Sequence, residues 1–245
     1  MKPFSFRRAL ALGLLLIGIP LALWLCTSLN RKYYVGGSAA ILLTFLSFFL
    51  QFEDRKPQAR ELVILAVMCS LAVASRAVFA AVPHFKPMVA IIMLTGIAFG
   101  PEAGFLTGAL SGFVSNFIFG QGPWTPWQMF AYGMGGLAAG FFAQWGILKR
   151  RPQKLRDVIA LGVFGFLGVA VLVGPLLDTC TLITMAAVIN TTSVGAVYLS
   201  GLVINLLHGS ATAVTMLLIG KPLLRKLGRI QIKYGMMETG HFGKG

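Results

Sequence analysis

Residues 62–82 read LVILAVMCSLAVASRAVFAAV, and this stretch decides the fold class. Arg76 is its one charged residue, and the stretch is about as long as the 20 or so apolar residues that an α-helix needs to cross a bilayer. We therefore predict a transmembrane helix here.

The composition of the whole chain agrees with that prediction. The 245 residues are 57% apolar and 11% charged, with a mean hydropathy of +0.81. An average soluble domain has about 25% charged residues, so this chain has too few to cover a water-facing surface. A soluble globular protein is excluded, and we expect a polytopic membrane protein.

Further apolar runs divide the chain into about eight membrane segments, at residues 9–25, 35–52, 88–99, 103–119, 128–148, 158–177 and 197–219 besides the first. The run at 88–99 is short and lies between Pro87 and Pro101, so we expect a tilted or partial helix. The stretch 181–196 either extends the seventh helix or forms a re-entrant segment.

The expected fold is an all-α membrane bundle in three parts. Residues 1–60 form an N-terminal two-helix hairpin and linker, residues 61–225 form a six-helix core, and residues 226–245 form a basic cytoplasmic tail. No sizeable soluble domain fits between the spans.

The positions of the positive charges predict the orientation. The net charge is +14, which in a soluble protein would suggest nucleic acid, but most of the 21 lysines and arginines lie in clusters between or after spans. The clusters are at residues 2–8, 55–60, 149–156 and 221–244, whereas Arg31, Lys32 and Lys86 fall on the other side. Both termini are therefore expected in the cytoplasm, and the expected partner of these charges is the lipid bilayer rather than nucleic acid.

Arg76 is the strongest single signal for a functional site. A charged residue within a span costs about 2.5–3.5 kcal/mol and usually faces a cavity, a counter-ion or a ligand. Snorkelling to the outer interface is the alternative, because Arg76 stands only six residues before Val82. Asp178 is the acidic residue placed to pair with it.

Other polar residues are expected in the same outer half of the bundle. We predict a substrate-binding set made of residues from several runs and loops: Arg76, Lys86, Asn116, Trp124, Trp127, Gln128, Asp178, Asn190, Tyr198 and Asn205. Tyr198 and Asn205 are seven residues apart and so share a helix face. His208 lies deeper, and a packed histidine is the plainer interpretation.

The loop GQGPWTPWQ, residues 120–128, contains two tryptophans and two prolines and no charge. Prolines and glycines fix an irregular backbone, so the indoles are held at low entropic cost. Trp124 and Trp127 either belong to an interfacial aromatic belt or cover a ligand, and we favour the second interpretation.

Small residues recur at four-residue spacing on several runs. Gly104, Gly108 and Gly112 form one stripe, and Ala66, Ser70 and Ala74 form another. Such stripes allow helices to approach closely, either inside the bundle or against a partner membrane protein.

Catalytic and cofactor motifs are missing from the sequence. There is no Walker A sequence, HExxH or GxSxG, and Cys26, Cys69 and Cys180 do not have metal-ligand spacing. We therefore predict no enzyme, no cofactor and no metal.

Residues 62–140 resemble a known family. The segments FKP (85–87), GPxAGF (100–105), GAxS (108–111) and GQGPWTPWQM (120–129) are similar to the substrate-binding S component of energy-coupling factor (ECF) vitamin transporters. The six runs from Leu62 to Ile219 correspond to that family's six-helix core.

The resemblance implies a function and partners. The protein would capture a vitamin or precursor outside a prokaryotic cell, associate with a transmembrane T component and two cytoplasmic ATPases, and topple in the membrane to release its cargo. Ala66, Ser70 and Ala74 would provide the face that contacts the T component, although the family has alanine where Ser70 stands.

A corrinoid is the first expectation for the substrate, followed by riboflavin, thiamine and pyridine-type vitamins. An intramembrane enzyme using Arg76, Asp178 and His208, and a non-transporting scaffold, are the alternative functions.

Overall fold

A computed structural model describes residues 6–28, 39, 42–43, 46–47, 59–82, 85–185 and 190–234. Most of the second predicted span, 35–52, and the end of the basic tail, 235–245, lie outside the described residues. The described part is helical and contains no strand, so the predicted all-α class is confirmed. Its helices are α1 (Phe6–Gly13), η1 (Leu14–Gly18), α2 (Ile19–Ser28), α4 (Ala59–Val78), α5 (Met88–Phe99), α6 (Pro101–Phe119), α7 (Thr125–Gln144), α8 (Leu155–Leu167), η2 (Gly168–Val173), α9 (Gly174–Met185) and α10 (Thr191–Tyr234).

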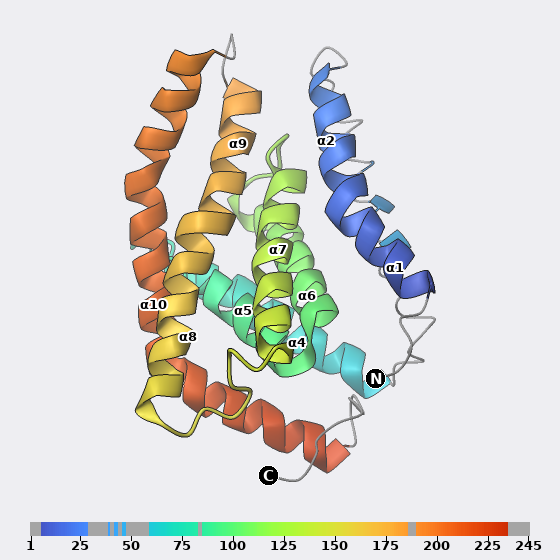
Figure 1. Cartoon of the computed structure of the whole chain (residues 1–245), viewed down its shortest axis with the longest axis vertical. Coiled ribbons are helices and arrows are strands. Elements are labelled where there is room, and N and C mark those ends of the chain that lie inside the picture. Colours follow the sequence, from blue (N-terminus) through green and yellow to red (C-terminus); the bar gives the residue numbers. More distant parts are fainter. Residues whose placement is uncertain are drawn as a thin grey trace.

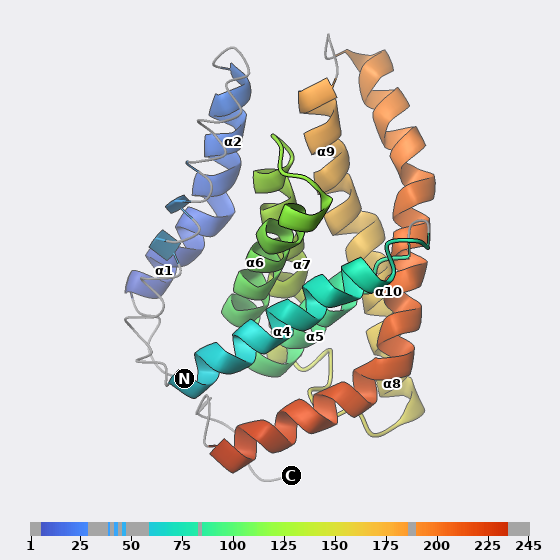
Figure 2. The ribbon, with the colours of Figure 1, turned by 180° about the vertical axis from the view of Figure 1, so that it is seen from behind.

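Helix α5 lies at the centre of the bundle. Each of its residues, Met88 to Phe99, is buried, and α4, α6, α7 and α10 all pack against it (Figures 1 and 2). The two prolines that bracket the run set its bounds as expected, because Pro87 precedes the first helical residue and Pro101 starts the next helix. Gly100, with φ 101°, makes the reversal between α5 and α6 in a single residue.

Helices α6 and α7 approach each other at backbone distance. A methyl group on Gly104 would overlap the carbonyl of Gly136, and one on Gly108 would overlap the carbonyl of Tyr132. The stripe of glycines on α6 is thus used inside the bundle, which decides between the two interpretations for that stripe.

The seventh predicted helix is longer than its apolar run. Helices α8, η2 and α9 follow one another without a break from Leu155 to Met185, so residues 181–185 extend this helix. Residues 186–189 are outside the described part.

Helix α10 also continues beyond its predicted end at Ile219. It bends near Pro222, and its last part runs across the bottom of the bundle (Figures 1 and 2). The first residues of the predicted basic tail therefore form the final turns of α10. Gln231 Nε2 donates to the carbonyl of Ala98 at 2.8 Å and fixes those turns to the end of α5.

The chain is a membrane protein. Three of its described helical segments are long and apolar enough to cross a bilayer: Ala59–Val78, Leu155–Thr184 and Thr191–Lys233. They carry large exposed apolar side chains such as Val171, Leu199 and Leu218, each 71% exposed, which a lipid environment covers.

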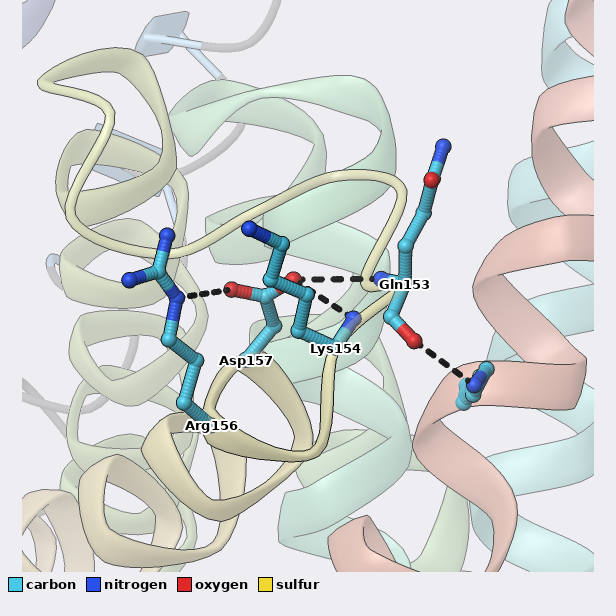
Figure 3. A network of polar contacts seen from close by, with 5 residues as sticks. Gln153, Lys154, Arg156 and Asp157 are labelled. Atoms are coloured by element: carbon cyan, nitrogen blue, oxygen red, sulfur yellow. Dashed lines mark hydrogen bonds and ion pairs between the residues drawn. The ribbon is translucent and has the colours of Figure 1, made fainter.

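The basic connection between α7 and α8 lies at the same end of the bundle as the last part of α10. Asp157 accepts hydrogen bonds from the backbone N–H groups of Gln153 and Lys154, at 3.1 and 3.0 Å, and lies 3.8 Å from Arg156 Nε (Figure 3). Lys221 Nζ on α10 donates to the carbonyl of Gln153 at 3.0 Å. These contacts hold the basic loop against α10.

Candidate functional site

A polar cluster lies where α4, α6 and α7 meet, and we call it the Arg76 cluster (Arg76, Ser115, Asn116, Thr125 and Gln128). Arg76 is in the last turn of α4 and is 8% exposed. Its Nη1 donates to Ser115 Oγ at 2.5 Å and to Asn116 Oδ1 at 3.1 Å. The side chain thus points toward α6 rather than out to the membrane surface.

Asn116 links the arginine to helix α7. Its Nδ2 donates to Thr125 Oγ1 at 3.1 Å and to Gln128 Oε1 at 2.8 Å. Thr125 in turn donates to Gln121 Oε1 at 2.9 Å and accepts from the N–H of Gly122 at 3.2 Å. The tryptophan-containing loop is therefore tied through Asn116 to Arg76, and the cluster joins three helices and this loop.

The positive charge of Arg76 is next to aromatic and basic neighbours. Its guanidinium carbon lies 4.5 Å from the centroid of the Phe119 ring. Its Nε is buried without a hydrogen-bond partner. Burial lowers the pKa of Lys86, in the loop between α4 and α5, and the positive charge of Arg76 adds to that lowering.

The expected pair of Arg76 and Asp178 is not formed. Asn205 Nδ2 on α10 donates to Asp178 Oδ2 at 2.6 Å, while Arg76 bonds to α6. Asp178 belongs to α9, and α9 packs against α7, η2 and α10. The prediction was wrong because sequence position gives the depth of a residue in the bilayer, but not the neighbour that its helix face meets.

Asp178 belongs instead to a second cluster between α9 and α10. The hydroxyls of Thr179 and Tyr198 form a hydrogen bond of 2.7 Å in which either one can be the donor. Glycines make room for the other pair, since a methyl on Gly201 would overlap the Asp178 carboxylate and one on Gly174 would overlap the Asn205 amide. Two pairs of polar residues, Asp178 with Asn205 and Thr179 with Tyr198, thus join α9 to α10.

The two tryptophans expected in one loop lie in different environments, because Trp124 directly precedes α7 and Trp127 is in its first turn. Trp124 is 37% exposed, and its indole covers Gly122. Trp127 is 9% exposed and packs in an apolar cluster with residues such as Phe105 and Phe130. A covering role fits Trp124, whereas Trp127 is a packing residue of the bundle.

Asn190 has a local structural role that the sequence analysis did not assign. It precedes α10, where its Oδ1 accepts from the N–H of Ser193 at 2.8 Å and its own N–H donates to Ser193 Oγ at 2.9 Å. This reciprocal arrangement caps the helix, and Asn190 is exposed at the turn.

The small-residue stripe of α4 faces outward. Ala66, Ser70 and Ala74 are all exposed, while Cys69, Ala72 and Val73 on the opposite face are buried. Close helix packing inside this chain therefore does not account for that stripe.

Several residues of the two clusters were not predicted. Ser115, Thr125 and Thr179 are the partners of Arg76, Asn116 and Tyr198. Each is directly next in sequence to a predicted residue, Asn116, Trp124 or Asp178, so a search of the immediate neighbours of the predicted residues would have included them. Small hydroxyl residues are otherwise common in membrane helices and give no signal by themselves.

Comparisons with known proteins identify the family. The sequence model described as "ECF-type riboflavin transporter, S component" matches residues 56–227, which include both clusters. The chain belongs to this family. ECF S components are membrane transport subunits rather than an enzyme family, and the resemblance seen in the sequence is confirmed.

Curated relatives carry uninformative names. A UPF0397 protein of Clostridium perfringens (strain SM101 / Type A) is 28% identical over 158 residues, which are 63% of this chain and 78% of the relative. A UPF0397 protein of Streptococcus gordonii (strain Challis) is 30% identical over 152 residues, 61% of this chain and 75% of the relative. No solved structure matches this S component.

Proposed function

We propose that this S component captures a vitamin from outside the cell and delivers it inward when docked to an energising module. The observation that carries the proposal is the Arg76 cluster, a buried polar network within the matched region and tied directly to the tryptophan loop. A few placed polar groups in an apolar surround are typical of small-molecule sites. Binding and release change no covalent bond of the cargo.

The ligand site combines the two polar clusters. From the Arg76 cluster, Arg76, Asn116 and Gln128 offer donors and acceptors. Lys86 adds a second positive charge, and Trp124 adds a flat apolar surface. Asp178, Tyr198 and Asn205 offer the same kinds of groups from α9 and α10, while Trp127 and Asn190 act by supporting the loop and the α9–α10 turn. Riboflavin is the first vitamin to test, because the matching family is described by it. Nothing favours the corrinoid that was first expected.

The orientation follows from the basic end. The α7–α8 connection and the last part of α10 lie together at one end of the bundle, and the positive-inside rule assigns this end to the cytoplasm. Both termini are then cytoplasmic in a topology of about eight spans, and Trp124 and the α9–α10 turn face outward. The membrane is the cell membrane of a prokaryote.

The outward-facing stripe of α4 is the proposed docking face. Ala66, Ser70 and Ala74 present small side chains on which a helix of a T component can pack closely. Two cytoplasmic ATPases bound to the T component would supply the energy, since this chain has no Walker A sequence. Toppling of the S component in the membrane would then open the ligand site inward.

The experiment is mass spectrometry of the small molecule retained by the purified protein, together with uptake by cells that coexpress the energising module. An unaltered vitamin and ATP-dependent uptake support the proposal. A chemically altered molecule would point to an enzyme, and no retained molecule with no uptake would point to a scaffold.

A further inference from the structure

Arg76 has no negatively charged partner among the described residues. The chain has only 7 aspartates and glutamates. Of those described, Glu61 is in the first turn of α4 and Glu102 in the first turn of α6, each at the helix end opposite the Arg76 cluster. Asp157 is in the α8 cap at the basic end, and Asp178 is bonded to Asn205.

The acceptors that Arg76 does have are neutral. They are the hydroxyl of Ser115 and the amide oxygen of Asn116, and both are reached by the same Nη1. Nε is buried and unpartnered, which is costly for a charged group. The guanidinium therefore keeps both unmatched charge and an unused donor.

Lys86 adds a second positive charge to the same region. It precedes Pro87 at the start of α5 and is half-buried. The rings of Phe79, three residues after Arg76, and of Phe85, directly before Lys86, lie 5.0 Å apart between their centroids, which brings the loop with Lys86 back to the Arg76 end of α4. The pKa of Lys86 is lowered first by burial and then by the positive charge of Arg76, in agreement with this placement. Nothing in the described fold compensates for the repulsion between these two cations.

We propose, on the basis of the function above, that Arg76 and Lys86 bind an anionic group of the captured molecule, a phosphate or a carboxylate. Guanidinium and ammonium groups together are well suited to such an oxyanion, which would take the unused donor of Arg76 and neutralise the pair. Among flavins, the preferred ligand is then riboflavin 5′-phosphate rather than neutral riboflavin. Arg76 is only 8% exposed and points into the α4–α6 contact, which fits a bound solute better than a lipid headgroup.

The test compares the two flavins on the full chain in nanodiscs of phosphatidylcholine, by fluorescence titration. The unaltered protein should bind riboflavin 5′-phosphate at least about tenfold more tightly than riboflavin, about 1.4 kcal/mol. In Arg76→Gln and in Lys86→Gln this ratio should fall toward one. The second variant removes no hydrogen bond of the cluster and so keeps the test valid if Arg76→Gln does not fold. Lys226→Gln, on the exposed basic end of α10, should keep the ratio and serves as the matched control.

Equal affinity for the two flavins, or a ratio that survives Lys86→Gln in the folded protein, would overturn the inference. Failure of both flavins to bind would overturn it as well. The proposed transport function is tested separately, by vitamin uptake in cells that also express the energising module. A repeat with phosphatidylglycerol distinguishes the source of the anion. If that lipid abolishes the preference for the phosphate, the cations bind lipid headgroups and the inference is wrong.

Discussion

Arg76 on α4 and Asn116 on α6 are joined by a hydrogen bond of 3.1 Å between Nη1 and Oδ1. Asn116 is 1% exposed, and its own amide nitrogen donates to Thr125 and Gln128 in the first turn of α7. The amide of this one residue of α6 thus bonds to groups of two other helices, α4 and α7, and joins the three helices.

Replacement of Asn116 separates its structural role from its electrostatic one. Asn116→Leu leaves Arg76, Thr125 and Gln128 each short of a partner and should destabilise the protein by about 3 kcal/mol. Asn116→Asp keeps an acceptor for Arg76 and should melt at a higher temperature than the leucine variant, while losing preference for an anionic ligand. Thermal unfolding in detergent measures the first effect, and a leucine variant as stable as the unaltered protein would contradict the network.

The contact between α6 and α7 should tolerate no added side chain. Gly136→Ala places a methyl against the backbone of Gly104, which cannot move like the end of a side chain, so we expect a loss of about 2 kcal/mol or more. Gly195→Ala is the matched control, because nothing lies within 4 Å of the added methyl and the residue is in helix α10. The control should unfold at the same temperature as the unaltered protein or slightly higher, and equal melting of both variants would refute the close packing.

Trp124, directly before α7, and Trp127, in the first turn of α7, should respond differently to truncation. Trp127→Ala opens a cavity in the apolar cluster and should cost about 3–5 kcal/mol of stability. Trp124→Ala should weaken ligand binding with little change in the melting temperature, because its indole is partly exposed and covers only Gly122. Thermal unfolding and ligand titration on both variants check this, and a stable Trp127→Ala would show that the indole is not a packing residue.

Lys86 should be unfavourable for stability in the absence of ligand. Its folded pKa lies below the usual 10.5, so the unfolded chain holds more protons in the interval between the two values, and stability rises with pH there. Below that interval the lysine is charged in both states, and its full penalty remains. Lys86→Gln should therefore be more stable than the unaltered protein at neutral pH, by at most about 1 kcal/mol because the side chain is only half-buried.

The same comparison has a pH signature. As the pH approaches 10.5, the melting temperatures of the unaltered protein and of Lys86→Gln should converge, because the lysine loses its charge in the folded state first. If the two melting temperatures are equal at neutral pH, or if their difference grows in alkaline buffer, Lys86 is not held near another positive charge.

Much of the fold could be predicted from local signals. Pro87 and Pro101 fixed the bounds of the buried helix α5, and the glycines of α6 indicated a close helix contact, because backbone rules act at the residue itself. The length of α10 could not be predicted. Its last turns carry the charged Arg225 and Arg229, and they are helical through contacts such as that of Gln231 with α5.

Six of the residues predicted for the site, Arg76, Asn116, Gln128, Asp178, Tyr198 and Asn205, lie in the two polar clusters, but the sequence did not predict how they are arranged. A charge in an apolar run correctly indicated that Arg76 is bonded inside the bundle, since burial of an isolated charge is too costly. Its partner was not predictable, because hydropathy reports depth and not the azimuth of each helix. For the same reason the burial of Trp127 beside the exposed Trp124 became visible only in the folded chain.

The most direct test of the proposed transport function is uptake of labelled riboflavin by cells that express this chain with an ECF T component and its two ATPases. We expect uptake that stops when the ATPases are inactivated, and that also stops in Ala66→Leu, whose larger side chain blocks the α4 face while purified protein still binds ligand. Val171→Leu, at an exposed position on η2 away from the α4 face, should transport normally. Uptake that persists without active ATPases would contradict the account, and normal transport by Ala66→Leu would contradict the docking face.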